Sequence, residues 1–183
     1  MIPERRPFER SYWAAPGQLL AGCYPGDLNP EAMRAKLDGL LRAGVTLVVN
    51  LMEATEVDHA GRPFIDYQLP LEQAARKADQ QLRWVRFPIR DMSIPPTAQM
   101  REILDAIHTE IRAGGVVYVH CWGGKGRTAT VVGCFLLETG LEDRQTVLNK
   151  IRSLTAHASK FFWPTPQTQE QCDFVINWSF EAR

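Results

Sequence analysis

A cysteine and an arginine enclose a short glycine-rich loop, residues 121–127, with the sequence Cys-Trp-Gly-Gly-Lys-Gly-Arg. An apolar, β-branched run at 116–119 precedes it and a long apolar run at 129–137 follows it, which predicts a strand, a tight turn and a helix start. Glycine tolerates positive φ and close backbone approach, so successive N–H groups can point into one concavity. The unpaired N–H groups and positive dipole end of a helix N-terminus add to that field. The glycine-rich loop therefore predicts an oxyanion site with a thiol beside it.

The polar residues in and beside the loop suit attack on a bound oxyanion. The field at a helix N-terminus favours a thiolate over a thiol, so Cys121 is the predicted nucleophile. The planar guanidinium of Arg127 can hold two oxygens of one phosphate group. The hydroxyl of Thr128 can lie near the sulfur, and His120 is expected to orient the loop by hydrogen bonding rather than to act as a base. The other predicted phosphate-binding residues are Trp122, Gly123, Gly124, Lys125 and Gly126.

The pattern His-Cys-x5-Arg-Thr, from His120 to Thr128, resembles the signature of the cysteine-dependent protein tyrosine and dual-specificity phosphatases. This resemblance implies the phosphatase fold and two-step hydrolysis of a phosphomonoester through a phosphocysteine. It also implies that no metal and no other cofactor is needed, because the arginine and the loop amides supply the positive charge. A Walker-type nucleotide loop fits poorly, since Lys125 is followed by Gly126 rather than by serine or threonine.

Departure of the leaving oxygen requires a general acid, and Asp91 is the candidate. It follows a predicted strand and lies in a proline-bounded segment, residues 88–96, which we call the acid loop. Its spacing of 30 residues from Cys121 resembles that of the general-acid loop in the phosphatases. The resemblance implies that Asp91 first protonates the leaving group and then deprotonates the hydrolytic water. Asp79 and Asp105 fit less well, because one precedes a strand and the other lies inside a predicted helix.

A second polar pattern, Gln-Thr-x-x-Gln, begins at Gln167. It resembles the glutamine loop of tyrosine-specific phosphatases, which implies that Gln167 positions the hydrolytic water and that Gln171 supports it. The same residues also suit a polar helix N-terminus capped by Thr165 or Thr168, and this alternative stays open.

The sequence does not identify which phosphoester is the substrate. The size of the chain is similar to that of the dual-specificity group, so we expect a protein tyrosine or dual-specificity phosphatase acting on a phosphorylated protein or a small phosphoester. Lys125 gives the loop a resemblance to phosphoinositide phosphatases, but Trp122 replaces a second loop lysine, so an inositide or inositol phosphate is the alternative. A catalytically inactive phosphate-binding module is a further alternative. A rhodanese-like sulfurtransferase also has a cysteine in an anion-binding loop, and the upstream Asp91 argues against it.

Composition sets the context for this site. A chain of 183 residues suits one phosphatase domain over 1–183, and 21 basic against 21 acidic residues give no sign of a nucleic-acid partner. No apolar run reaches the roughly 18 residues of a membrane span, and the N-terminus lacks the apolar core of a signal peptide. The widely spaced Cys23, Cys134 and Cys172 are expected to be buried thiols. We therefore expect a monomer in the reducing cytoplasm.

The elements that must position these residues alternate along the chain. The sequence predicts a hairpin at 12–23, strands at 45–51, 82–89 and 116–119, and helices at 30–43, 97–113, 143–154 and 166–180, besides the helix after the glycine-rich loop. Residues 53–82 are expected to form a loop and a short helix at 71–78. This alternation predicts a three-layer α/β sandwich with a largely parallel central sheet. The glycine-rich loop would lie at the carboxyl end of a strand, where open α/β sheets bind ligands.

Overall fold

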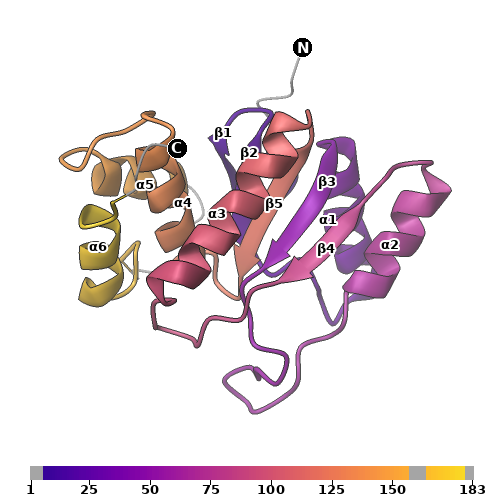
Figure 1. The fold of residues 1–183 in the computed structure, drawn as a ribbon. Coiled ribbons are helices and arrows are strands. Elements are labelled where there is room, and N and C mark those ends of the chain that lie inside the picture. Colours follow the sequence, from indigo (N-terminus) through magenta and orange to yellow (C-terminus); the bar gives the residue numbers. More distant parts are fainter. Residues whose placement is uncertain (1–5, 157–163, 180–183) are drawn as a thin grey trace.

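The computed structural model describes residues 6–156 and 164–179, which form helices packed against one central sheet (Figure 1). The strands are β1 (Ser11–Ala15), β2 (Leu19–Cys23), β3 (Val45–Asn50), β4 (Arg83–Arg86) and β5 (Val116–Cys121). The helices are α1 (Pro30–Arg42), α2 (Gln68–Lys77), α3 (Thr97–Arg112), α4 (Arg127–Glu138), α5 (Val147–Thr155) and α6 (Gln169–Ile176).

The sheet is mixed and mostly parallel, with the strand order β1-β2-β5-β3-β4. The β1–β2 hairpin is antiparallel, and β2, β5, β3 and β4 run parallel to one another. This arrangement confirms the predicted α/β fold. It places β5 at the centre of the sheet, so the glycine-rich loop that follows β5 is flanked by the ends of β2 and β3.

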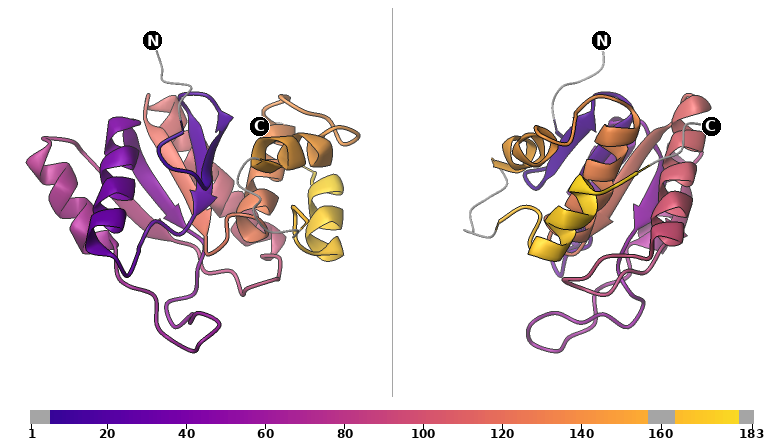
Figure 2. Two further views of the ribbon diagram at one scale, coloured as in Figure 1. Left: turned by 180° about the vertical axis from the view of Figure 1, so that it is seen from behind. Right: turned by 60° about the vertical axis from the view of Figure 1, so that its left-hand side comes forward.

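Both faces of the sheet are covered, which explains why the inner strands are apolar throughout. One core includes residues of α3, α4, α5 and α6, and the other includes residues of α1 and α2. Figure 2 shows α1 on the face of the sheet opposite α3. Alternate residues of β3 divide between the two cores, with Leu47 and Val49 in the first and Val48 in the second.

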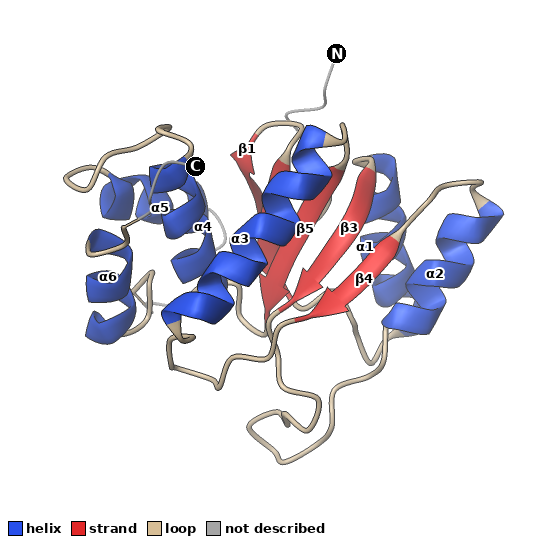
Figure 3. Ribbon diagram, viewed as in Figure 1, coloured by secondary structure: helices blue, strands red, loops and turns tan. Residues whose placement is uncertain are grey.

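The carboxyl ends of β3, β4 and β5 meet at one edge of the sheet (Figure 3). Besides the segment after β2, three connections leave from that edge: the loop of residues 51–67 after β3, the acid loop after β4, and the glycine-rich loop after β5. Segments far apart in the sequence are thus brought together, as expected for the ligand-binding edge of a parallel sheet.

Each predicted element is present, but several ends differ: the strand predicted at 82–89 is β4, Arg83–Arg86, and the short helix predicted at 71–78 is α2, Gln68–Lys77. The helix predicted at 143–154 begins at Val147, because Asp143 accepts hydrogen bonds from the backbone of Gln145 and Thr146 in a preceding turn. The helix predicted at 166–180 runs from Gln169, after the Thr168 cap, to Ile176, and residue 180 lies outside the described residues. Within the described ranges, no helix has the length and apolar character needed to cross a membrane.

Candidate active site

The glycine-rich loop turns tightly around the sulfur of Cys121. Cys121 ends β5 with 2% of its surface exposed, and the backbone N–H of Gly124 donates to its Sγ at 3.3 Å. Gly124 has a φ of 75°, and a Cβ at this position would lie 2.6 Å from the carbonyl carbon of Gly22. Glycine is therefore required at position 124 both by conformation and by close backbone approach.

Arg127, the first residue of α4, is buried at the base of the loop with 1% of its side chain exposed. Its Nη1 and Nη2 donate to the two carboxylate oxygens of Glu56 at 2.7 and 2.8 Å. Burial is the largest single effect and opposes the charge of the guanidinium, but the hydrogen bonds to Glu56 and the nearby charges of Cys121, Glu56 and Asp91 together raise the pKa of Arg127 above its usual value. The bidentate pair fixes the plane of the guanidinium, and among the described groups its Nε has no hydrogen-bond partner.

Sequence reasoning missed Glu56. Glu56 is one of several acidic residues at the start of segment 53–82, which has no clear hydrophobic periodicity. Nothing in the spacing of these residues distinguishes Glu56 from Glu53 or Asp58. In the structure the side chain of Glu56 is 8% exposed and reaches Arg127 from the 51–67 loop, whereas Asp58 pairs with Arg62. The difference between a buried partner and a solvated acid is set by the tertiary fold.

Asp91 lies at the same guanidinium. Its Oδ1 is 2.8 Å from Nη2 of Arg127, and its side chain is 46% exposed. The backbone carbonyl of Ile89 accepts a hydrogen bond from Nη1 of Arg127 at 3.0 Å, so the acid loop is attached to Arg127 at two points. The structure thus brings together the predicted acid, the predicted phosphate ligand and the predicted nucleophile.

Both predicted glutamines lie against the glycine-rich loop. A Cβ built on Gly126 would be 2.4 Å from Oε1 of Gln167 and 3.1 Å from the side-chain amide of Gln171. Thr168 and Gln171 also form a capping box at the start of α6. The capping alternative is therefore correct for Thr168 and not for Thr165, and it coexists with the position of both glutamines beside the loop.

His120 is fully buried behind the loop in a chain of hydrogen bonds. Its Nδ1 lies 3.1 Å from the carbonyl oxygen of Cys121, its Nε2 contacts the Tyr67 hydroxyl, and Nε1 of Trp84 donates to that hydroxyl at 2.9 Å. Burial lowers the pKa of His120 from 6.5 to about 3. A neutral ring that donates from Nδ1 and accepts from Tyr67 holds the Cys121 carbonyl and has no free nitrogen with which to act as a base.

The free energy of unfolding should fall as the pH is lowered from about 6.5 toward about 3. In this window the unfolded chain binds a proton on His120 that the folded chain does not bind, so acid favours unfolding. Each pH unit should cost about 1.4 kcal/mol from this residue. Urea unfolding of wild type and His120→Asn at several pH values in this window measures the effect, and identical pH dependence for both proteins would contradict it.

The remaining loop residues have distinct surroundings. Trp122 packs against His59 and Phe64 of the 51–67 loop, with ring centroids 4.4 and 5.2 Å apart. Lys125 is 6% exposed, and burial, followed by the charge of Arg10, lowers the pKa of its ammonium group. Arg10 also donates to the carbonyl of Gly123 at 2.9 Å. The loop is therefore supported from the N-terminal segment as well as from the 51–67 loop.

Thr128 and the three remaining cysteines are also buried. Thr128 is fully buried, and its hydroxyl has no hydrogen-bond partner among the described groups. The thiols of Cys23, Cys134 and Cys172 are buried and free, as expected from the sequence. In the part of the chain that the structure describes, no cluster of three or more histidine, cysteine, aspartate or glutamate side chains could hold a metal ion.

Comparisons with known proteins agree with this geometry. Residues 9–163 match the family described as Swiss Army Knife protein, DSP-PTPase phosphatase domain. The chain is 27% identical over 126 residues to human dual specificity protein phosphatase 15, covering 68% of this chain and 41% of that protein. The chain thus spans about two fifths of the length of this relative.

Two solved structures extend the comparison at the level of the fold. The active form of Tk-PTP has a TM-score of 0.67 and 23% identity, covering 92% of this chain and 95% of that one. PTPMT1 in complex with PI(5)P has a TM-score of 0.61 and 19% identity, covering 90% of this chain and 93% of that one.

Proposed function

Because this chain belongs to the DSP-PTPase phosphatase domain family, within the dual-specificity-like cysteine phosphatases, we propose that it hydrolyses phosphomonoesters through a phosphocysteine on Cys121. One observation carries the proposal: the guanidinium of Arg127, fixed by Glu56, lies at the base of the Cys121 loop and also binds Asp91. A buried cation, a thiol under backbone N–H groups and a carboxylic acid are the three groups that the reaction requires.

In the first step, Sγ of Cys121 attacks phosphorus, the S–P bond forms and the P–O bond to the leaving group breaks. The loop N–H groups and Arg127 stabilise the charge on the equatorial oxygens. Nη2 of Arg127 contacts Asp91, so a phosphate that binds Arg127 would take that position and release Asp91 toward the leaving oxygen. Asp91 takes up a proton from solvent once it has left the guanidinium, and it donates that proton to the leaving oxygen.

In the second step, water attacks the phosphocysteine, Asp91 accepts a proton from it, and the S–P bond breaks to release inorganic phosphate and the thiolate. Gln167 is the residue that we assign to positioning this water, because its Oε1 lies against Gly126 at the edge of the loop. The thiolate of Cys121 must stay reduced throughout, which favours a reducing compartment such as the cytoplasm.

For the substrate we favour a phosphorylated protein, with an aryl phosphate such as phosphotyrosine as the simplest fit. Trp122, backed by Phe64 and His59, gives the loop an aromatic side rather than a second cation. A phosphoinositide is the second candidate, supported by Lys125 in the loop and by the fold likeness to PTPMT1, whose complex contains PI(5)P. Turnover of phosphotyrosyl and phosphothreonyl peptides against soluble inositides distinguishes these substrates.

Chelation should leave the activity intact. We expect the wild-type protein to hydrolyse 4-nitrophenyl phosphate at the same rate with and without EDTA, because Arg127 and the loop amides supply the positive field. A loss of turnover that added metal restores would contradict the metal-free mechanism. Absence of turnover under all conditions, with inorganic phosphate still bound, would favour the phosphate-binding module instead.

Asp91→Asn should lower kcat/KM by about 10²–10⁴-fold, the usual contribution of a general acid. Asparagine keeps the shape of the side chain but has no proton to give to the leaving oxygen. Asp79→Asn is the matched control, since Asp79 is exposed and its φ of 53° is one that asparagine tolerates. Steady-state kinetics with phenyl phosphate check the prediction, and a loss of less than threefold relative to Asp79→Asn would argue against Asp91 as the acid.

A further inference from the structure

Side chains from outside the acid loop hold it on both sides of Asp91. Before Asp91, Nε2 of Gln99 donates to the Pro88 carbonyl at 2.9 Å and Arg127 donates to the Ile89 carbonyl. After Asp91, Nε2 of Gln171 donates to the carbonyl of Ser93 at 3.1 Å. Gln171 comes from α6, 78 residues further along the chain than Ser93.

The side-chain amide of Gln171 also binds the backbone just before α6. Its Oε1 accepts hydrogen bonds from the backbone N–H groups of Gln167 and Thr168 at 3.0 and 3.3 Å. The side chain has no exposed surface. Because a buried amide that loses a partner carries a large desolvation penalty, its orientation is strongly fixed. One buried amide therefore joins the acid loop, the glutamine segment and the edge of the glycine-rich loop.

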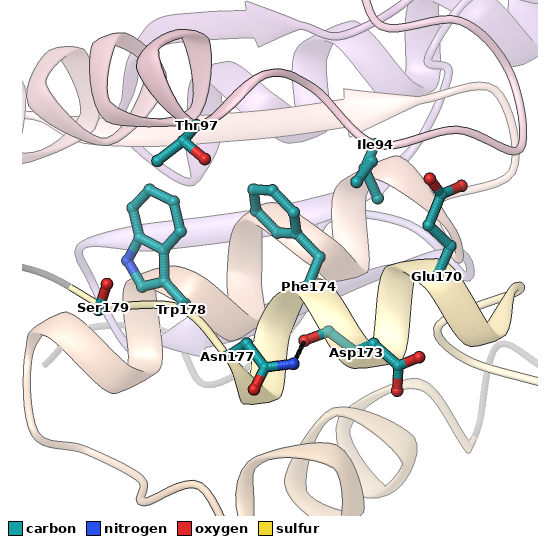
Figure 4. A pocket seen from close by; sticks show the side chains of 8 residues that line it. All are labelled: Ile94, Thr97, Glu170, Asp173, Phe174, Asn177, Trp178 and Ser179. Carbon is teal, nitrogen blue, oxygen red and sulfur yellow. Dashed lines mark hydrogen bonds between the residues drawn. The ribbon is translucent and has the colours of Figure 1, made fainter.

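Apolar packing does less to fix this part of the acid loop. Figure 4 shows a hollow between its end and α6, with Ile94 and Thr97 on one side and Phe174 and Trp178 on the other. The volume of this hollow is about 500 Å³. Ser93 directly precedes Ile94, which lines this hollow, so the hydrogen bond from Gln171 to Ser93 is a polar contact that holds this end of the acid loop.

We propose that Gln171 is a positioning residue for leaving-group protonation: its bond to the Ser93 carbonyl holds the acid loop where Asp91 faces Arg127 and the thiol. This role differs from support of the hydrolytic water, which belongs to the second chemical step. The inference rests on the proposed phosphatase activity. It makes the first step depend on a residue that does not touch the substrate.

The dependence of rate on the leaving group tests this role, because kcat/KM reports the steps up to phosphocysteine formation. Phenolate needs protonation to depart much more than 4-nitrophenolate does. Gln171→Leu should therefore lose roughly 10–100-fold in kcat/KM with phenyl phosphate, the scale expected for a catalytic group displaced by about an ångström, and clearly less with 4-nitrophenyl phosphate. Gln169→Leu is the matched control, since exposed Gln169 on the same helix bonds only to Asp173 among the described side chains.

Gln171→Glu supplies a second readout that a structural role would not give. Its carboxyl group keeps an acceptor for the N–H groups of Gln167 and Thr168, and only the protonated form can donate to Ser93. Its deficit relative to wild type should shrink as the pH is lowered. Thermal unfolding of each variant shows that the compared proteins are folded.

Two results would overturn the inference while the proposed function stands. One is an equal loss on both substrates for Gln171→Leu, and the other is a Gln171→Glu deficit that does not change with pH. Failure of the wild-type protein to turn over either substrate would instead remove the proposed function, and the inference with it.

Discussion

Cys121→Ser should reduce turnover of 4-nitrophenyl phosphate by at least about 10⁴-fold, the scale seen when a covalent nucleophile is removed. A serine hydroxyl is not ionised at neutral pH and would need a base to activate it. The nearby His120 cannot act as that base, because both ring nitrogens are engaged, with the Cys121 carbonyl and with Tyr67. The backbone N–H groups of the loop and Arg127 remain, so the variant should still bind inorganic phosphate in a calorimetric titration.

Cys172→Ser is the control for this experiment, since Cys172 is a buried thiol on α6 that we place outside the reaction. Its turnover should match that of wild type. Equal rates for wild type and Cys121→Ser would exclude Cys121 as the nucleophile. A Cys121→Ser protein that neither turns over substrate nor binds phosphate would indicate a collapsed loop, and Cys121→Ala would then be needed to separate binding from attack.

Arg127→Lys should reduce kcat/KM by about 10³–10⁵-fold, the range attributed to an arginine at a transferring phosphoryl group. Lysine keeps the charge but lacks the planar guanidinium group. In Arg127 this group binds both carboxylate oxygens of Glu56 and presents further N–H groups to the site. The variant should also be less stable, by less than the about 3–5 kcal/mol that follows complete loss of one partner of a buried pair, because lysine keeps the charge opposite Glu56 but not the bidentate hydrogen bonds.

Combining Arg127→Lys with Glu56→Gln tests whether the loss of activity comes from the altered pair with Glu56. The double variant should not recover melting temperature, because the lysine loses its buried counter-charge, and kcat/KM should stay low. Activity of the single variant within tenfold of wild type would show that Arg127 is not the phosphate ligand. Recovery of activity in the double variant would show that the loss came from misplaced Glu56 rather than from missing contacts to phosphate.

The parts of the site that lie in one stretch of sequence were predictable. Residues 120–128 contain the proposed nucleophile, the loop and the helix start in sequence, so local geometry fixes their arrangement. The position of Asp91 was predictable as well, because Asp91 lies in the loop that follows β4. This strand pairs with β3, which in turn pairs with β5. The α/β fold was predictable because strands and helices alternate along the chain and the strands are apolar. Few other architectures are compatible with this pattern.

Residues contributed by the 53–82 segment were not predictable. Glu56 and Tyr67 act through contacts across 71 and 53 residues of sequence, and no periodicity marks them. Gln171 shows a different obstacle. A capping box and a glutamine loop use the same residue types at the same spacing, and the structure uses Gln171 for the cap and for the acid loop together.

Trapping the covalent intermediate tests the central claim most directly. Wild-type protein mixed with a ³²P-labelled phosphopeptide and quenched in acid within the first turnover should carry label on the peptide that contains Cys121, and Cys121→Ser should carry none. Hydrolysis by the wild-type protein without label on Cys121, or with label on another residue, would contradict a phosphocysteine mechanism at this loop.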